Sequence, residues 1–342
     1  MNRFNQGILL LGAMLAFAGC GGSGSSGGAG GDTTLMPPDP VATYDGVNLS
    51  APYSVSVTTG VVYGTAPVNQ AAPTEQSLLL DLYQPDVDLA GADVPTVVVI
   101  HGGGFIGGSR QQSQLQRIGD ELAARGFVAV SIDYRLVPDD AVLNNASQAL
   151  FNSLALASPE AEIVRSLLAA LEDTQTAIQW LDSTLADQGA RSQGVALLGS
   201  SAGAVTSLDY AYSLSRYGIP TLQVDAVAAL WGTLVLGQDD PGVIDSMDAP
   251  VIMIHGTADS TVSYELGSLL VASRASAAGL PHELITNVGA GHGYSANDIF
   301  EQETSPGSGQ TQIERTYQFI AVALLAADCL RQELVIDNCS LP

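Results

Sequence analysis

The rhythm of apolar and polar positions changes partway along this chain. Residues 53–63, rich in Val and Thr, and the largely apolar residues 78–83 each predict a short strand, with proline-bearing loops between them. From residue 95 onward, apolar runs without polar alternation are separated by stretches of helical periodicity. Continuous apolar runs are typical of parallel strands that are covered on both faces. The pattern therefore predicts leading antiparallel strands followed by repeated β-α-β units.

The repeated units follow a regular order. Further strands are expected at residues 96–100, 127–132, 195–198, 226–230, 251–254 and 282–287, and helices at residues 113–125, 172–185, 202–217, 264–278 and 312–330. Such alternation predicts an α/β fold with a mostly parallel central sheet and helices on both faces. A chain of 342 residues, of which 46% are hydrophobic, can bury this sheet in one large domain.

One stretch interrupts the alternation. Residues 136–171 lie between a strand and the next sheet-covering helix, which is long for a plain connection. Two asparagines precede helical segments rich in Ala and Leu. We expect either a small lid over the strand ends or a peripheral excursion without substrate contact, and the sequence leaves both open.

The amino-terminal residues are typical of an exported protein. Arg3 precedes an apolar run at residues 8–18 that is too short to span a membrane, so residues 1–19 are expected to be a signal peptide. Small residues directly before Cys20 resemble the lipobox of bacterial lipoproteins. This resemblance implies that Cys20 is acylated and anchors the protein in the cell envelope, in the periplasm or at the outer membrane.

The expected organisation follows from this segment. Residues 20–40 contain a run of Gly and Ser that suits a tether, and residues 41–342 form the folded domain. The alternative is ordinary secretion with cleavage near Ala18, which leaves Cys20 as a free thiol in a tail.

Two more cysteines lie near the carboxyl end. Cys329 and Cys339 are ten positions apart, and in an oxidising compartment this spacing favours a disulfide. No further ligands of suitable spacing accompany them, so we expect a structural bridge and no metal site.

The charge balance excludes one class of partner. Acidic residues number 35 and basic residues 11, all of them arginine, which gives a net charge of −24. Such a surface repels phosphate backbones, so no nucleic-acid partner is expected, whereas a neutral or cationic substrate meets no such barrier. The composition favours solubility and is also found in proteins from salty media, where screening reduces self-repulsion.

Ser201 is the candidate nucleophile. It is the central residue of a Gly-x-Ser-x-Gly pentapeptide, from Gly199 to Gly203, that lies between an expected strand and an expected helix. A serine hydroxyl is a weak nucleophile near neutral pH, so it needs a base within hydrogen-bond reach. Flanking glycines allow the tight turn that exposes its oxygen. The spacing selects Ser201 rather than Ser200.

A second glycine-rich segment, His-Gly-Gly-Gly-Phe, begins at His101, directly after an expected strand. In lipase- and esterase-like proteins a segment of this kind helps to form the oxyanion hole. The candidate donors are therefore the backbone N–H groups of Gly102 and Gly103, together with that of Ala202 beside the nucleophile. The alternative is a plain glycine turn.

The base is expected to follow the serine in sequence. Among the four histidines, His292 lies in a glycine-rich loop after a strand and is the candidate base. His101 belongs to the glycine-rich segment. His255 lies just past a strand and His282 opens one, so both are interpreted as structural.

The orienting acid is expected between the serine and the base. Asp259 lies in a loop at the carboxyl end of the strand expected at 251–254, which makes it the candidate. Asp298 comes after the histidine, and Asp225 precedes a different strand, so both fit less well.

Three segments carry a family resemblance. They are Leu-Asp-Leu-Tyr at 80–83, the glycine-rich segment at 101–105 and Asp-Tyr-Arg-Leu at 133–136. From about residue 78 to residue 330, the chain resembles the α/β-hydrolase superfamily, in its branch of carboxylesterases and hormone-sensitive-lipase-like proteins. The resemblance implies the α/β-hydrolase fold and hydrolysis of carboxylic esters without a cofactor.

The same resemblance assigns roles to residues. It implies a triad of Ser201, Asp259 and His292, and structural roles for the Asp-Tyr-Arg residues at 133–135. Ser200 departs from the pattern, because relatives often carry an acidic residue there, and Ala204 replaces a common glycine. These departures leave the subfamily undecided and do not affect the residues of the triad.

The expected function is that of a serine carboxylesterase that forms an acyl-enzyme. Aromatic residues make up only 6% of the chain, and this composition together with the modest insertion favours short-chain or carbohydrate-linked esters, on a small molecule or a polysaccharide. Membrane contact is expected only through the lipid anchor. An oligopeptidase- or dienelactone-type hydrolase is the nearest alternative, because His255 and Asp259 share its spacing. A catalytically silent binding module is a further one.

Overall fold

The structure, a computed structural model, describes residues 32–34, 43–44, 47–293 and 298–331. The strands are β1 (Asp32–Thr34), β2 (Thr43–Tyr44), β3 (Val47–Asn48), β4 (Val55–Val68), β5 (Thr74–Pro85), β6 (Asp93–Ile100), β7 (Val128–Ile132), β8 (Arg191–Ser200), β9 (Ala226–Leu230), β10 (Val251–Gly256) and β11 (His282–Asn287). The helices are α2 (Ser113–Ala124), η1 (Val137–Asp139), α3 (Asn145–Leu154), α4 (Glu160–Asp187), α5 (Ala202–Tyr212), η2 (Leu214–Tyr217), α6 (Ser268–Ala278), α7 (Asp298–Glu301) and α8 (Gln312–Arg331).

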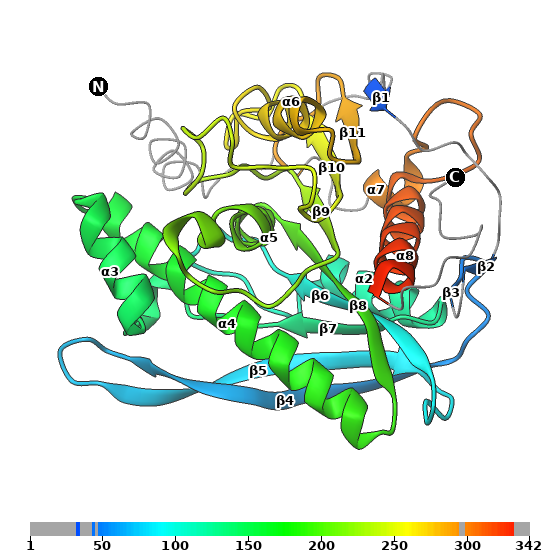
Figure 1. Cartoon of the computed structure of the whole chain (residues 1–342), viewed down its shortest axis with the longest axis horizontal. Helices are drawn as coiled ribbons and strands as arrows, with labels where there is room; N and C mark the ends of the chain where they lie inside the picture. Colours follow the sequence, from blue (N-terminus) through cyan, green and yellow to red (C-terminus); the bar gives the residue numbers. More distant parts are fainter. Residues whose placement is uncertain (1–31, 35–42, 45–46, 294–297, 332–342) are drawn as a thin grey trace.

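One sheet organises the described part of the chain. Nine strands lie in the spatial order β4-β5-β7-β6-β8-β9-β10-β11-β1 (Figure 1). The six strands from β7 to β11 in this order are parallel to one another, whereas β4, β5 and β1 pair antiparallel at the two edges. The predicted mostly parallel sheet with leading antiparallel strands is therefore confirmed.

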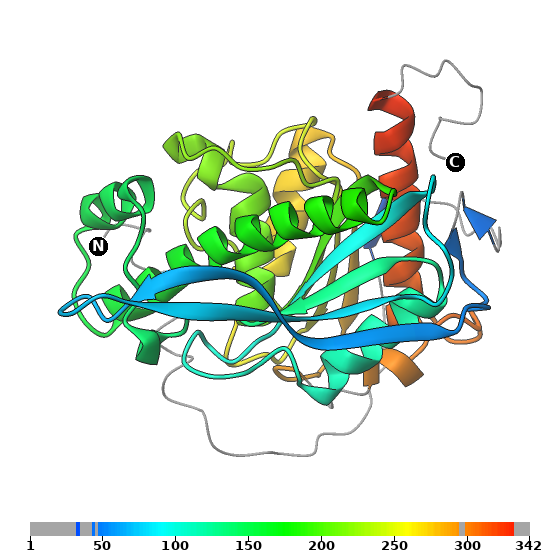
Figure 2. The same ribbon diagram turned by 90° about the horizontal axis from the view of Figure 1, so that it is seen from below.

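Helices cover both faces of the sheet, because successive side chains of each strand point to opposite faces. In β6, Val98 and Ile100 pack with α4 on one face, and Val97 and Val99 pack with α2 and α8 on the other. Figure 2 shows α4 and α2 on opposite sides of the strands. Burial on both faces explains why these strands read as continuous apolar runs.

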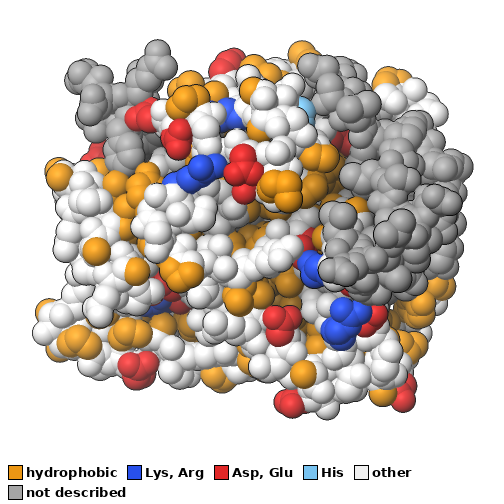
Figure 3. All heavy atoms as spheres, in the orientation of Figure 1, with side chains coloured by type: hydrophobic (Ala, Val, Ile, Leu, Met, Phe, Trp, Pro, Cys, Tyr) orange, Lys and Arg blue, Asp and Glu red, His pale blue; other side chains and the backbone are white. Residues whose placement is uncertain are grey.

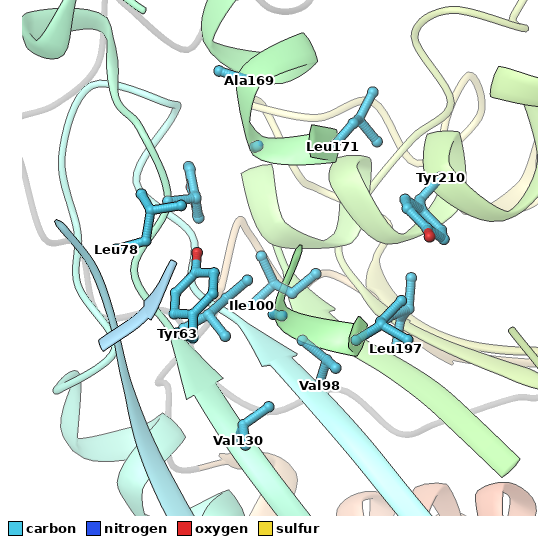
Figure 4. Packing of buried hydrophobic residues seen from close by; sticks show 14 of the residues in the cluster. Tyr63, Leu78, Val98, Ile100, Val130, Ala169, Leu171, Leu197 and Tyr210 are labelled. Carbon is cyan, nitrogen blue, oxygen red and sulfur yellow. The ribbon is translucent and has the colours of Figure 1, made fainter. Parts of the chain in front are cut away.

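The core beneath α4 joins neighbouring strands. Val98, Val130 and Leu197 come from β6, β7 and β8, and Figure 4 shows them on the side of the sheet where Ala169 and Leu171 of α4 lie. All five side chains are buried. The strands that end at the candidate site are therefore fixed by packing along their length.

The interrupting stretch differs from expectation. Helix α4 begins at Glu160 rather than near residue 172, and Ile163, Leu167 and Leu168 are buried against the sheet. Apolar residues recur at helical spacing from Ile163 onward with no break, so the sheet-covering helix extends into the supposed insertion. The remaining excursion consists of η1 and α3. Residues of α3, α4 and β4 border a cavity of about 420 Å³.

Two other helices are shorter than predicted. Helix α5 ends at Tyr212, where the Ser213 hydroxyl donates to Asp209, and a 3-10 turn replaces the expected continuation. Helix α6 begins at Ser268 because the preceding residues form a turn beside the candidate acid. Within the described residues, no helix combines the length and apolar character needed to cross a membrane.

Candidate active site

Ser201, His292 and Asp259 form a hydrogen-bonded chain at the carboxyl edge of the sheet. The Oγ of Ser201 lies 2.9 Å from Nε2 of His292, and Nδ1 of His292 lies 2.8 Å from Oδ2 of Asp259. Since a carboxylate only accepts, Nδ1 carries the hydrogen and Nε2 is left to accept the serine proton. The three candidates, widely separated in sequence, are thus brought together in the geometry that nucleophilic catalysis requires.

The nucleophile is held in a strand-to-helix turn. Ser201 directly follows β8 and precedes α5, with φ 53° and ψ −117°, a conformation that non-glycine residues rarely adopt. Its N–H donates to Leu230 O of β9 at 2.9 Å. A Cβ at Gly199 would collide with the backbone of Gly203, which explains the glycine at that end of the pentapeptide.

Two loops carry the acid and the base. Ala258 N–H donates to Ala290 O at 2.9 Å, and Gly289 N–H donates to the Thr257 hydroxyl oxygen at 2.8 Å, so the loops after β10 and β11 are tied together. These strands are parallel neighbours, and their loops therefore leave the same edge of the sheet. The pairing explains why residues 33 positions apart meet.

The carboxylate of Asp259 accepts four hydrogen bonds. Its Oδ1 accepts from the N–H groups of Thr261 and Val262, both at 2.8 Å, and its Oδ2 accepts from His292 and also from His255. Burial alone would raise the pKa of Asp259, but the hydrogen bonds from the two histidines outweigh it and hold the pKa well below its usual range. The acid is therefore ionised across the whole working range of an enzyme.

The glycine-rich segment lies against the nucleophile. A Cβ added to Gly102 would come within 3.0 Å of Ser201 Cβ, so this backbone passes directly beside the serine. Gly103 has φ +122°, which side chains disfavour, and a Cβ there would strike Gly107. Ala202 opens α5, where backbone N–H groups have no acceptor within the helix. Gly102 and Ala202 thus lie directly beside the nucleophile, and Gly103 follows Gly102 in the same turn, so all three remain the candidate oxyanion donors.

Aromatic packing fixes the same segment. The rings of His101 and Tyr134 stack with centroids 4.2 Å apart, and the Tyr134 hydroxyl donates to His101 O at 3.0 Å. Nδ1 of His101 lies 2.7 Å from Gly102 O, and burial lowers the pKa of this imidazole. Phe105 O accepts from Val137 N–H at 2.8 Å. These contacts hold the backbone N–H groups in place before any substrate arrives.

The residues at 133–135 pack as the resemblance implies. Asp133 forms an ion pair with Arg110 and also accepts from its backbone N–H at 2.7 Å. The buried Arg135 pairs with Asp173 of α4 at 2.8 Å. Both pairs connect the loops around the glycine-rich segment to the rest of the fold.

Sequence reasoning did not predict one contact of the candidate acid. His255 lies inside β10 rather than past its end, and its Nε2 is 3.1 Å from Asp259 Oδ2. A histidine four positions before the candidate acid was the available signal. Asp225, the weaker candidate acid, instead accepts from Val195 N–H at 3.0 Å and pairs with Arg331, away from His292.

Several predicted features concern residues for which the structure offers no test. The signal peptide at 1–19, the acylated Cys20 and Cys339 lie outside the described residues, and the side chain of Cys329 is not described either.

Sequence comparisons cover only parts of the chain. The BD-FAE family model matches residues 80–148, which run from β5 to α3 and include the glycine-rich segment. A non-reducing polyketide synthase of Emericella nidulans is 40% identical over 81 residues, which are 23% of this chain. A second such synthase, of Aspergillus calidoustus, is 35% identical over 107 residues, or 30% of this chain. The chain spans only 3% and 4% of the lengths of these two proteins.

Solved structures match over most of the chain. Esterase 2 of Thermogutta terrifontis, phosphorylated by paraoxon, has a TM-score of 0.50 at 23% identity and covers 78% of this chain and 91% of its own. A truncated carbohydrate esterase from gut microbiota has a TM-score of 0.51 at 17% identity, and the match covers 79% of this chain and 98% of the esterase. Brefeldin A esterase, described as a bacterial homologue of human hormone-sensitive lipase, has a TM-score of 0.50 at 16% identity. The match covers 96% of this chain and 87% of the esterase. Together with its strand order, these likenesses show that the chain has the α/β-hydrolase fold.

Proposed function

We propose that this protein is a serine esterase that hydrolyses carboxylic esters through an acyl-enzyme. The observation that carries the proposal is the chain Ser201–His292–Asp259, with contacts of 2.9 and 2.8 Å, placed against the backbone of Gly102. This arrangement brings a nucleophile, a base, an orienting acid and candidate oxyanion donors together at one site.

The reaction follows from these positions. His292 Nε2 takes the hydroxyl proton as Ser201 Oγ bonds to the ester carbonyl carbon, and the carbonyl oxygen becomes an oxyanion facing Gly102, Gly103 and Ala202. As the C–O bond breaks, the same proton passes from His292 to the departing alcohol. Water then attacks the acyl-enzyme with His292 again as base, and Ser201 regains its proton when the acid leaves.

Replacement of Ser201 tests the proposal. Ser201→Ala removes the attacking oxygen and is expected to abolish turnover of p-nitrophenyl esters and labelling by a fluorophosphonate. Ser200→Ala is the matched control, because this adjacent, buried serine ends β8 and is expected to be dispensable for chemistry. Undiminished turnover in the folded Ser201→Ala variant would refute the assignment.

The preferred substrates are short-chain or carbohydrate-linked esters. The sparse aromatic residues support this choice, and a carbohydrate esterase is among the proteins with the same fold. An acyl chain-length series of p-nitrophenyl esters, run beside acetylated xylan, tests it. Faster turnover of long-chain esters than of short ones would contradict the preference, and cleavage of aminoacyl-p-nitroanilides would favour the peptidase alternative.

The proposed place of action is the bacterial cell envelope. Support comes from the apolar run at 8–18, the lipobox-like residues before Cys20 and the tether that follows them. Labelled palmitate is expected to enter the wild-type protein and not the Cys20→Ala variant. We also propose a Cys329–Cys339 disulfide, which predicts a gain of two hydrogens in intact mass upon reduction.

A further inference from the structure

A second imidazole contacts the oxygen that orients the base. Nε2 of His255 lies 3.1 Å from Oδ2 of Asp259, and Nδ1 of His292 lies 2.8 Å from the same atom. The other oxygen, Oδ1, already accepts from two backbone N–H groups. His255 is therefore placed on the side of the carboxylate that faces the base.

The neighbours of His255 determine which nitrogen carries its hydrogen. Nε2 also lies 3.0 Å from Val262 O, and both Val262 O and the Asp259 carboxylate only accept, so Nε2 must be protonated. Nδ1 lies 2.8 Å from the Ser268 hydroxyl, which donates to it when the ring is neutral. The Ser268 hydroxyl thereby satisfies Nδ1 in the tautomer that presents an N–H group to Asp259.

The ring has little freedom to turn away. Its side chain is fully buried, and the Tyr264 ring packs edge-on against it with centroids 5.7 Å apart. A Cβ at Gly267 would come within 3.2 Å of the imidazole, so this glycine leaves the space that the ring occupies. The contacts to Ser268 and Asp259 are therefore set by packing.

We propose that His255 is a positioning residue: its Nε2–H occupies one lone pair of Asp259 Oδ2 and so directs the other toward Nδ1 of His292. The inference rests on the proposed function and deepens it, because it adds a fourth residue to the assembly of base and acid. The two backbone donors to Oδ1 hold the loop, whereas His255 orients the oxygen that His292 contacts. The hydrogen bond from His255 also helps to keep the pKa of Asp259 low despite its burial.

Two amide substitutions separate the contacts of the ring. In His255→Gln the amide nitrogen reaches the place of Nε2 and can still donate to Asp259. In His255→Asn it reaches only the place of Nδ1 and leaves Oδ2 without its second donor. Both variants put a polar amide into the same buried space, so each is the matched control for the other.

The variants are compared with the wild type in p-nitrophenyl ester turnover, fluorophosphonate labelling and thermal unfolding. His255→Asn is expected to lower kcat by roughly tenfold to a hundredfold with KM unchanged, a loss of the size known for outer-shell partners of metal ligands. His255→Gln is expected to recover most of the wild-type kcat. A purely structural role would reduce the thermal stability of both variants without separating their kcat values.

The possible outcomes are distinct. Equal kcat in the folded Asn and Gln variants, or a loss confined to KM, would overturn the inference while leaving the esterase intact. An inactive wild type would overturn the proposed function and the inference with it. If His255→Asn does not fold, Ser268→Ala replaces it: loss of the hydrogen bond to Nδ1 is expected to loosen the hold on the imidazole and to lower kcat at unchanged KM. An unchanged kcat would refute the role of His255.

Discussion

Among single residues, Asp209 carries a carboxyl group that the chemistry does not use. It is fully buried in α5 and accepts hydrogen bonds from Ser213 Oγ at 2.7 Å, Val235 N–H at 3.1 Å and Leu236 N–H at 3.0 Å. Burial raises the pKa of Asp209 from 3.8 to about 7, against the opposing effect of these donors. The folded protein therefore holds this proton more tightly than the unfolded chain.

This difference predicts the sign of a pH effect on stability. Between about pH 4 and pH 7 the folded state binds more protons at Asp209, so the free energy of unfolding should fall as pH rises, by up to roughly 4 kcal/mol. Thermal unfolding measured across this window checks it. Asp209→Asn, which cannot ionise, is the control and should flatten the slope, and an identical slope in both proteins would rule out Asp209 as its source.

Among the elements around the site, the glycine-rich loop at residues 101–105 would hold the candidate oxyanion donors Gly102 and Gly103. Gly103→Ala places a Cβ where Gly107 lies, at a φ of +122°, so the loop must shift and its N–H groups leave the oxyanion. The expected loss in kcat is about a hundredfold or more, the cost of removing one oxyanion donor in other hydrolases. Steady-state kinetics on p-nitrophenyl esters measure it.

A matched control separates loop strain from catalysis. Gly91 also has a positive φ, +76°, but a Cβ there meets open space, and the residue lies in an exposed loop before β6. Gly91→Ala is expected to cost some stability and leave kcat unchanged. If both variants kept wild-type kcat, the glycine-rich segment could not be the oxyanion site.

Among the secondary-structure elements, the strands were easier to predict from the sequence than the boundaries of the helices. Doubly buried strands such as β6 and β9 leave uninterrupted apolar runs between turn residues, and the sequence shows them directly. The start of α4 was wrong because residues before Leu171 have the same Ala/Leu periodicity in a lid as in a covering helix. Only packing against the sheet distinguishes the two, and packing is not a local property.

The residues of the candidate site likewise differ in how far the sequence alone predicts them. Ser201 and the glycine-rich segment were located by spacing, because tight turns require particular residues at fixed offsets. His292 and Asp259 were found by their order along the chain. The contact between His255 and Asp259 was not predicted, because it depends on the direction in which a buried ring points, toward an oxygen four positions away. Whether the stretch at residues 136–171 contributes a lid stays a prediction.

For the whole molecule, the dominant property is its charge. With 35 acidic and 11 basic residues, most carboxylates have no arginine to pair with, and on the face seen in Figure 3 acidic side chains are scattered among uncharged and hydrophobic ones. Mutual repulsion then opposes the compact state and is weakened by added salt. Buried pairs such as Arg135 with Asp173 are largely shielded from this effect.

The melting temperature is therefore expected to rise with ionic strength. Raising NaCl from about 0.01 M to 0.5 M shortens the Debye length from about 30 Å to a few ångströms. For a domain of this size, each kcal/mol of repulsion removed should add roughly 2–4 °C. Differential scanning fluorimetry in a salt series checks it, with an uncharged osmolyte series as control. A flat or falling melting temperature would show that surface repulsion contributes little.

The backbone of Ser201 has a further consequence for anyone who evolves or engineers this protein. A side chain at φ 53° and ψ −117° carries strain of about 1–3 kcal/mol, which glycine would relieve. Thermal stability therefore favours glycine at position 201, whereas the proposed reaction requires serine there. A library ranked only by survival at high temperature would enrich variants that have lost the reactive oxygen, so every round of selection has to score product formation as well.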